Sequence, residues 1–311
     1  MSGKKLQRQY KKHLSSFSTW APREHAHQWI IYPENMGTHL SIDEIALSQG
    51  ELFTIVTNKE ARGKKGCLVA IIAGTKADQV IEHICKIDHK KRSCVQEITL
   101  DMANSMKLIS KRCFSKAVQV TDRFHVQKLA LEALQEIRIK YRWEAMDAEN
   151  RLILQAKREN KTYVPELLPN GDSVKQLLAR SRYTLYKSRE KWTENQNERA
   201  QILFELYPDI KTAYRLVQQL RGIYNNNNDK HIAMTKLAHW YRNVEESGFK
   251  NFNTLLNTIT INYQSILNYF DNRSTNASAE SFNAKVKAFR SQFRGVRNVD
   301  FFLFRLSNLF G

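Results

Sequence analysis

The feature that most constrains the fold is a change in hydrophobic periodicity near residue 127. Between residues 39 and 121, apolar side chains alternate with polar ones or gather in short runs, as they do in half-buried or buried strands. From 127 to 270 the strand-like segments nearly vanish, and long stretches with helical spacing replace them. This order predicts a mixed sheet that is followed by a large all-helical block.

The first part of the chain divides into short segments of clear type. Three strands are joined by short connections, and a helix, a strand, a second helix and a final strand follow, with Asn104 as an expected helix N-cap. The expected strands are 39–47, 51–58, 67–74, 93–100 and 116–121, and the expected helices are 76–87 and 104–114. The predicted fold class is α/β, with a mixed five-stranded sheet and helices on its faces.

The organisation along the chain follows from these segments. Residues 1–38 are basic and weakly periodic, and we interpret them as an N-terminal arm. Residues 39–126 and 272–311 are expected to form one domain, since a helix over 277–293 and an apolar C-terminal segment follow the helical block. Residues 127–271 are then a helical insertion, whose aromatic residues are expected mainly in its core.

The charge of the chain points to a polyanionic partner. Lys and Arg number 49 and Asp and Glu 31, a formal net charge of +18 over 311 residues, which favours nucleic acid over a membrane surface. The chain has no apolar run long enough to span a bilayer, and its basic N-terminus lacks the apolar core of a secretory signal. Four scattered cysteines without a CxxC pair are expected to be reduced core residues of a cytoplasmic protein.

Four acidic residues are candidates for a ligand-binding site at one edge of the predicted sheet. Asp43 lies inside an apolar strand, where a charge is costly unless it is paired, protonated or bound to metal. Asp101 and Asp122 each follow a strand, and Glu280 lies near the start of a helix, where the helix dipole favours a carboxylate. Taken singly, Asp101 and Asp122 could be ordinary strand-ending residues, and Glu280 a solvated or capping residue. Taken together, acids on one sheet edge suit two divalent ions that act on a phosphodiester.

Four segments carry a resemblance to a known family. SIDEIAL (41–47), ITLDMANSM (98–106), VTDRFHVQKLALEAL (120–134) and STNASAESFNAKVKAFRSQFRGVRNVDFFLFR (274–305) together resemble the DDE transposases of bacterial insertion sequences. The similarity is to the ISL-three type and, within it, to the ISAon-like group, and it covers roughly residues 36–311. It implies a ribonuclease-H-like fold interrupted by a helical insertion, metal-dependent DNA cleavage at transposon ends, and strand transfer by the freed 3′-hydroxyl.

The resemblance also implies roles for individual residues. Asp43, Asp101 and Glu280 match the catalytic acids that hold two Mg²⁺ ions, for which Mn²⁺ is a possible substitute. Asp122 and His125 match an accessory D-x-x-H element, but Asp122 is also the rival second metal ligand, and His125 alone could be a structural histidine. Asn283 is expected on the same helix face as Glu280.

Basic residues around the last helix suggest a DNA-binding face. The expected phosphate contacts are Lys285, Lys287, Arg290, Arg294 and Arg297, with Lys64 and Lys65 adding to the same surface. The alternative is an ordinary solvated face, although no acid interrupts residues 284–298. In the helical insertion, Arg180, Arg182 and Lys187 are further candidates for contact with DNA.

The resemblance also raises expectations about partners. Before Asp43 the chain shows neither the zinc-binding segment nor the helix-turn-helix of longer family members, so end recognition would rest on a separately encoded protein or on the arm. Synapsis of two ends favours a homodimer that acts on the bacterial nucleoid. Two alternatives stay open at this point: a ribonuclease-H-like nuclease or resolvase without strand transfer, and a non-catalytic, domesticated DNA-binding protein.

Overall fold

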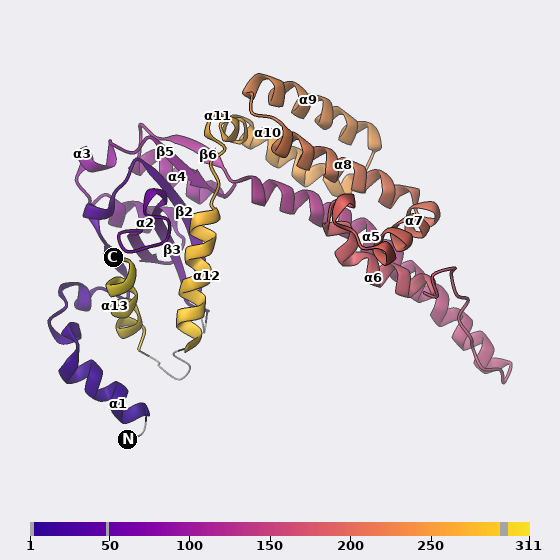
Figure 1. The fold of residues 1–311 in the computed structure, drawn as a ribbon, viewed down its shortest axis with the longest axis horizontal. Coiled ribbons are helices and arrows are strands. Elements are labelled where there is room, and N and C mark those ends of the chain that lie inside the picture. Colours follow the sequence, from indigo (N-terminus) through magenta and orange to yellow (C-terminus); the bar gives the residue numbers. More distant parts are fainter. Residues whose placement is uncertain (1–2, 48–49, 293–297) are drawn as a thin grey trace. The chain divides into compact units, whose positions relative to one another are not determined.

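The chain forms two compact units (Figure 1). The computed structural model describes residues 3–47, 50–292 and 298–311. Unit 1 comprises Met1–Asp122 and Gln264–Gly311, and unit 2 comprises Arg123–Tyr263. Unit 1 is therefore discontinuous in sequence, because the whole of unit 2 lies between its two segments.

Unit 1 is built on a six-stranded mixed sheet. Its strands are β1 (Trp29–Ile31), β2 (His39–Ala46), β3 (Leu52–Asn58), β4 (Leu68–Ala73), β5 (Glu97–Leu100) and β6 (Val118–Thr121), in the spatial order β1-β4-β3-β2-β5-β6. The pairs β1–β4, β3–β4 and β2–β3 are antiparallel, and β2–β5 and β5–β6 are parallel. The predicted mixed α/β class is confirmed, but the sheet has six strands and not five. The additional strand, β1, has three residues, which is too few for alternation to reveal it.

Helices cover both faces of this sheet. On one face, α2 (Ala77–Ile84) and α4 (Asn104–Cys113) pack with Leu40 and Ile42 of β2. On the other, α12 (Ala277–Gln292) and α13 (Val299–Phe310) pack with Ile45 of β2 and with strands β3 and β4. Alternation along β2 therefore assigns even-numbered residues to the α2/α4 face and odd-numbered residues to the α12/α13 face.

Two local predictions need correction. Helix α4 begins at Asn104 itself, after Ala103, and no side-chain hydrogen bond caps it, so Asn104 is not the N-cap. Of the four cysteines expected in the core, Cys67 and Cys113 are buried, but Cys85 and Cys94 are exposed. Both exposed cysteines lie at or just after the ends of short helices, α2 and α3 (His89–Arg92), where the chain turns at the surface.

The N-terminal segment is part of unit 1. It contains α1 (Gly3–Gln9), a π-helical turn (Tyr10–Leu14) and two 3₁₀ turns (Ser16–Thr19 and Ala21–Glu24) before β1. Phe17 is buried against α13, with ring centroids 5.2 Å from Phe301 and 5.5 Å from Phe304. Edge-to-face aromatic contacts of this kind add to the apolar burial, so they fix the segment against the sheet's C-terminal helix.

Unit 2 is all-helical. It contains α5 (Arg123–Arg158), α6 (Val174–Tyr186), α7 (Glu194–Leu206), α8 (Pro208–Asn226), α9 (Lys230–Ser247) and most of α10 (Asn253–Leu267). The chain re-enters unit 1 at Gln264, within α10, and α11 (Tyr269–Asn272) belongs to unit 1. Helices α6 and α7 begin with reciprocal capping boxes, Ser173 with Gln176 and Thr193 with Gln196. Trp240 is buried, and its indole N–H donates to the Leu216 carbonyl oxygen at 2.8 Å.

A buried carboxylate ties two of these helices together. Asp172, which precedes α6, is 1% exposed and accepts hydrogen bonds from Arg180 of α6 and from Arg199 Nε of α7, the latter at 2.9 Å. Burial of Asp172 would raise the pKa of its carboxyl, but the bonds and charges of Arg199 and Arg180 outweigh this and hold the pKa below its ordinary value. Arg180, a candidate for DNA contact, thus has a structural partner.

No helix among the described residues combines the length and hydropathy that crossing a membrane requires.

Candidate catalytic site

Asp43, within β2, and Asp101, directly after the end of β5, lie at the same level of two adjacent parallel strands. The register pairs Leu40 with Ile98 and Ser41 with Thr99, so its continuation by two residues places Asp43 beside Asp101. Both are odd-numbered, while the even-numbered residues of β2 and β5 pack with α2 and α4. Asp43 and Asp101 therefore share the sheet face that α12 covers, and both are half-buried.

Helix α12 contacts β2 directly at Asp43. The Asn283 side-chain amide donates to Asp43 Oδ2 at 2.6 Å, and Asp43 Oδ1 accepts from the Glu44 backbone N–H at 2.8 Å. Asn283 is buried, and Glu280 lies three residues earlier, in the first turn of α12. Residues three apart share a helix face, so Glu280 belongs to the face of α12 that meets Asp43, and it is exposed.

The acids create a negative local potential. Glu44, which follows Asp43 in β2, is half-buried. Its pKa is raised, mainly by burial and then by the negative charges of Asp101 and Asp43. A cation at this strand end would relieve that repulsion, and oxygen ligands of this kind are those that Mg²⁺ prefers. The donor chemistry therefore fits a divalent ion.

The three predicted metal ligands do not form a complete metal site in the described part of the chain. Within residues 3–47, 50–292 and 298–311, no three or more His, Cys, Asp or Glu side chains are arranged to hold a metal ion. Asp101 Oδ1 accepts from the Ala103 backbone N–H at 2.9 Å, which fixes the carboxylate at the start of α4. The structure thus aligns Asp43 with Asp101 and places Glu280 on the neighbouring helix, without bringing all three together.

Asp122 continues the row of acids but has different surroundings. The β5–β6 register pairs Leu100 with Thr121, so Asp122 lies next to Asp101 on the far side from Asp43. Asp122 is 1% exposed, and its charge acts on the half-buried Lys59, whose amine donates to Thr99 Oγ1 at 2.7 Å. His125 is half-buried in the first turn of α5, within unit 2.

Lys59 and its partners were not identified in the sequence analysis. Lys59 lies 3.5 Å from Glu97 Oε1, and Glu97 also accepts from the Asn272 side-chain amide at 3.1 Å. A glutamate inside a strand was the available signal, since a buried charge requires a partner. This network joins the 3₁₀ turn after β3 (Lys59–Ala61) to β5 and to α11.

A basic surface adjoins α12. Lys285 donates to the Gly63 carbonyl oxygen at 3.1 Å, which brings the loop between β3 and β4 against the helix. Lys64 and Lys65 of this loop are exposed, as are Lys285 and Lys287. The loop that bears Lys64 and Lys65 therefore lies against α12 at Lys285, and a DNA-binding role for these residues stays a prediction. Arg294 and Arg297 lie outside the described residues.

Arg290 does not belong to this surface. It is 7% exposed, its Nη2 lies 3.3 Å from both carboxylate oxygens of Glu51, and its guanidinium stacks 5.0 Å from the Phe302 ring centroid. The predicted phosphate contact at Arg290 is corrected to an internal ion pair, because Arg290 shares the buried face of α12 with Val286.

This placement predicts a loss of stability in Arg290→Gln. The change leaves Glu51 partly buried without its cation, and removing one partner of a buried pair costs about 3 kcal/mol. Chemical denaturation of the full chain would measure the difference, with the exposed Lys287→Gln as control. If the two variants have the same free energy of unfolding, the ion pair between Arg290 and Glu51 contributes nothing to stability.

Comparison with known proteins agrees with this geometry. A family model described as transposase, for the ISL-three type of DDE enzymes, matches residues 40–306. No significant match was found among curated proteins or among solved structures. The matched range spans β2 to α13, and so includes the aligned aspartates, the helical unit and α12. The chain therefore belongs to the transposase family of DDE enzymes of the ISL-three type.

Proposed function

We propose that this protein is an active transposase, which cleaves DNA at transposon ends and joins the freed 3′-hydroxyl to target DNA. The observation that carries the proposal is the alignment of Asp43 and Asp101 on one sheet face, with Asp43 bonded to the helix that bears Glu280. We propose these three acids as the metal ligands, with Mg²⁺ as the ion and Mn²⁺ as a substitute.

The residues of the chain have separate tasks in this proposal. Two bound divalent ions would activate the attacking oxygen and stabilise the leaving oxygen of a phosphodiester. The sheet fixes Asp43 and Asp101, and Asn283 orients the Asp43 carboxylate through its hydrogen bond. Glu280, in the first turn of α12, would supply the third carboxylate, and bound cations would offset the mutual repulsion of the acids. Lys64, Lys65 and Lys287 hold the phosphate backbone near this edge.

Access favours Asp101 over Asp122 as the second ligand. An ion that binds a substrate phosphate needs a carboxylate that substrate can approach, and Asp101 is half-buried while Asp122 is fully buried. Asp122 also has the cation Lys59 in its surroundings, which suits a structural charge. We assign Asp122 to support of the site.

The wider organisation is proposed on the same basis. We propose that unit 1 is the catalytic domain of ribonuclease-H-like type and unit 2 its helical insertion, and that the chain falls in the ISAon-like group. Two copies would act together on two transposon ends in the bacterial cytoplasm, at the nucleoid, with end recognition shared with a separately encoded protein.

A strand-transfer assay tests the proposed function. A labelled transposon-end duplex and a plasmid target are incubated with protein and Mg²⁺ or Mn²⁺, and cleaved and joined products are separated by electrophoresis. Joined product is expected with either ion and not with chelator. Cleavage without joining would favour a nuclease or resolvase, and DNA binding without cleavage would favour a domesticated, non-catalytic protein.

The basic surface makes a separate prediction about affinity. Lys64→Gln combined with Lys287→Gln is expected to weaken duplex DNA binding and to lower the slope of log K against log salt by about 2, because two phosphate contacts are lost. Fluorescence anisotropy across a salt series measures both quantities. Lys111→Gln with Arg112→Gln, exposed on α4 at the opposite sheet face, is the matched control. Equal losses in the two double variants would contradict a localised surface.

A further inference from the structure

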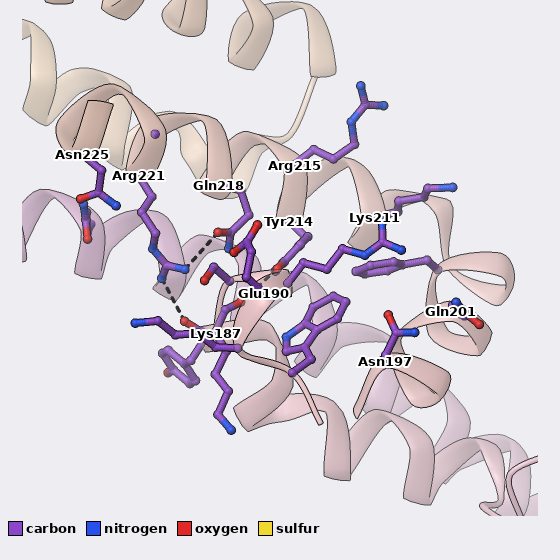
Figure 2. Close-up of a pocket in the computed structure, with 18 of the residues that line it drawn as sticks. Lys187, Glu190, Asn197, Gln201, Lys211, Tyr214, Arg215, Gln218, Arg221 and Asn225 are labelled. Atoms are coloured by element: carbon purple, nitrogen blue, oxygen red, sulfur yellow. Dashed lines mark hydrogen bonds between the residues drawn. The ribbon is translucent and has the colours of Figure 1, made fainter. Parts of the chain in front are cut away.

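Unit 2 contains a cavity that the proposed chemistry does not use. It measures about 1140 Å³ and lies between α7, α8 and the segment that connects α6 to α7, with the first turns of α5 also contributing (Figure 2). Small-ligand pockets usually measure roughly 300–1,000 Å³. The cavity is therefore large enough for a short stretch of a polymer.

Three aromatic rings form one wall of this cavity. Trp192, Phe204 and Tyr214 lie with ring centroids 5.4 to 6.2 Å apart. The Trp192 indole N–H donates to the Thr184 carbonyl oxygen at 2.8 Å, and the Tyr214 hydroxyl donates to the Lys187 carbonyl oxygen at 3.0 Å. Because both rings are tied to the backbone, they are held in place before any ligand arrives. Trp192 and Phe204 stay partly exposed.

The charge of the lining is strongly positive. Seven Lys or Arg residues line the cavity against two glutamates, Glu190 and Glu205. Arg221 is fixed by bonds to the Tyr186 carbonyl oxygen at 2.9 Å and to Gln218 Oε1 at 3.0 Å (Figure 2). Arg189, Lys191 and Lys211 are exposed, and no acid pairs with them in the part of the chain that the structure describes. The cavity therefore suits an anion with several charges.

Amide side chains complete the lining. Asn197 and Gln201 of α7 and Gln218 of α8 all line the cavity (Figure 2). An amide offers both a donor and an acceptor, as the edge of a nucleobase requires. Fixed rings, amides and unpaired cations are together the chemistry that binds stacked bases and phosphates.

We propose that this cavity binds an unpaired stretch of DNA strand, with bases on the Trp192, Phe204 and Tyr214 wall and phosphates on the surrounding cations. A duplex hides the faces of its bases in its own stack, so its bases cannot reach recessed rings. An unpaired strand exposes base faces and phosphates together, and stacking on aromatic side chains tolerates any base. The inference rests on the proposed function only in taking DNA as the polymer.

The test compares single-stranded with duplex DNA in the absence of metal. A labelled oligodeoxythymidylate and a blunt duplex are titrated against the full chain in chelator by fluorescence anisotropy. Phe204→Leu keeps the apolar volume but removes one ring, and is expected to weaken single-strand binding at least about 5-fold, the low end for loss of one stacked base. Duplex binding, which uses the basic surface of unit 1, is expected to stay unchanged.

A charge variant tests the phosphate contacts with a matched control. The combination of Arg189→Gln, Lys191→Gln and Lys211→Gln is expected to lower the single-strand salt slope by about 2. The control combines Arg151→Gln, Lys157→Gln and Arg158→Gln, which remove the same charge from exposed positions on α5 outside the cavity. Thermal melting establishes that both variants are folded.

Three results would overturn the proposal. Equal loss of single-strand affinity in the two triple variants would mean diffuse attraction by net charge. An unchanged single-strand affinity in Phe204→Leu would mean that bases do not stack on this ring. Competition by a free mononucleotide that binds as tightly as the single strand would assign the cavity to a small ligand. Because no metal or cleavage is needed, Asp43→Asn should bind the single strand normally even if the proposed catalysis fails.

Discussion

Asp43→Asn is expected to reduce DNA cleavage by roughly 10³-fold, because loss of a metal-binding charge removes several kcal/mol of transition-state stabilisation. The asparagine oxygen can still accept the backbone N–H of Glu44, and its amide can donate to the Asn283 side-chain oxygen once the Asn283 amide turns over, which replaces the bond that Asp43 accepts in the structure. The fold and the DNA affinity should therefore stay close to those of the parent protein. Single-turnover cleavage rates and anisotropy binding, measured on the same preparations, separate the two effects.

Neighbouring acids provide the controls for this result. Asp101→Asn is expected to lose cleavage to a similar extent, whereas Glu44→Gln, on the opposite face of β2, should retain it within a few-fold. Asp122→Asn is expected to lower the free energy of unfolding more than it lowers the cleavage rate, because the Asp122 carboxylate is buried near Lys59. Suppose that Asp101→Asn cleaves DNA normally and that Asp122→Asn folds well but does not cleave. That result would show that Asp122, and not Asp101, is the second metal ligand.

Asp172→Asn is expected to destabilise unit 2 by about 3 kcal/mol, the low end for breaking a buried ion pair, since Arg180 stays largely in solvent. The change removes the charge that joins α6 to α7 through Arg180 and Arg199. Hydrogen exchange should increase first in these two helices, and chemical denaturation of the full chain should show the loss. Asp147→Asn, exposed on α5, is the control.

The same carboxylate sets a dependence on pH. The pKa of Asp172 is lower in the folded protein than in the unfolded chain, so its contribution is complete above its ordinary pKa and is lost as the pH falls through the folded value. Below about pH 4 the stability of the parent protein should therefore approach that of Asp172→Asn. A constant difference between them down to the acid transition would contradict this assignment.

Local periodicity was sufficient for most of the sheet. The expected strand over 39–47 is β2, and the expected helix over 104–114 is α4, each within one residue of its observed bounds. Both segments have a regular pattern of buried side chains that is visible without any tertiary context. Strand β1 could not be predicted in this way, because its three residues show no pattern of their own and form a strand only by pairing with β4.

The candidate site depends on contacts that no local pattern contains. The alignment of Asp43 with Asp101 follows from a parallel register, and the bond from Asn283 to Asp43 joins residues 240 positions apart. Arg290 shows the same limit, since its basic character suggested phosphate while its burial against Glu51 decided its role. The candidate residues could be named from the sequence, but only the tertiary packing decided which of them lie at the site and which are internal.

The discontinuity of unit 1 has a consequence for synthesis on the ribosome. The strands emerge first, but α12 and α13, which cover one face of the sheet, emerge only after the whole of unit 2. At ordinary elongation rates this delay is on the order of ten seconds. During that time Ile45, Phe53 and Ile55 lack their covering helices, so a nascent or truncated chain presents an apolar sheet face to chaperones and also lacks Glu280.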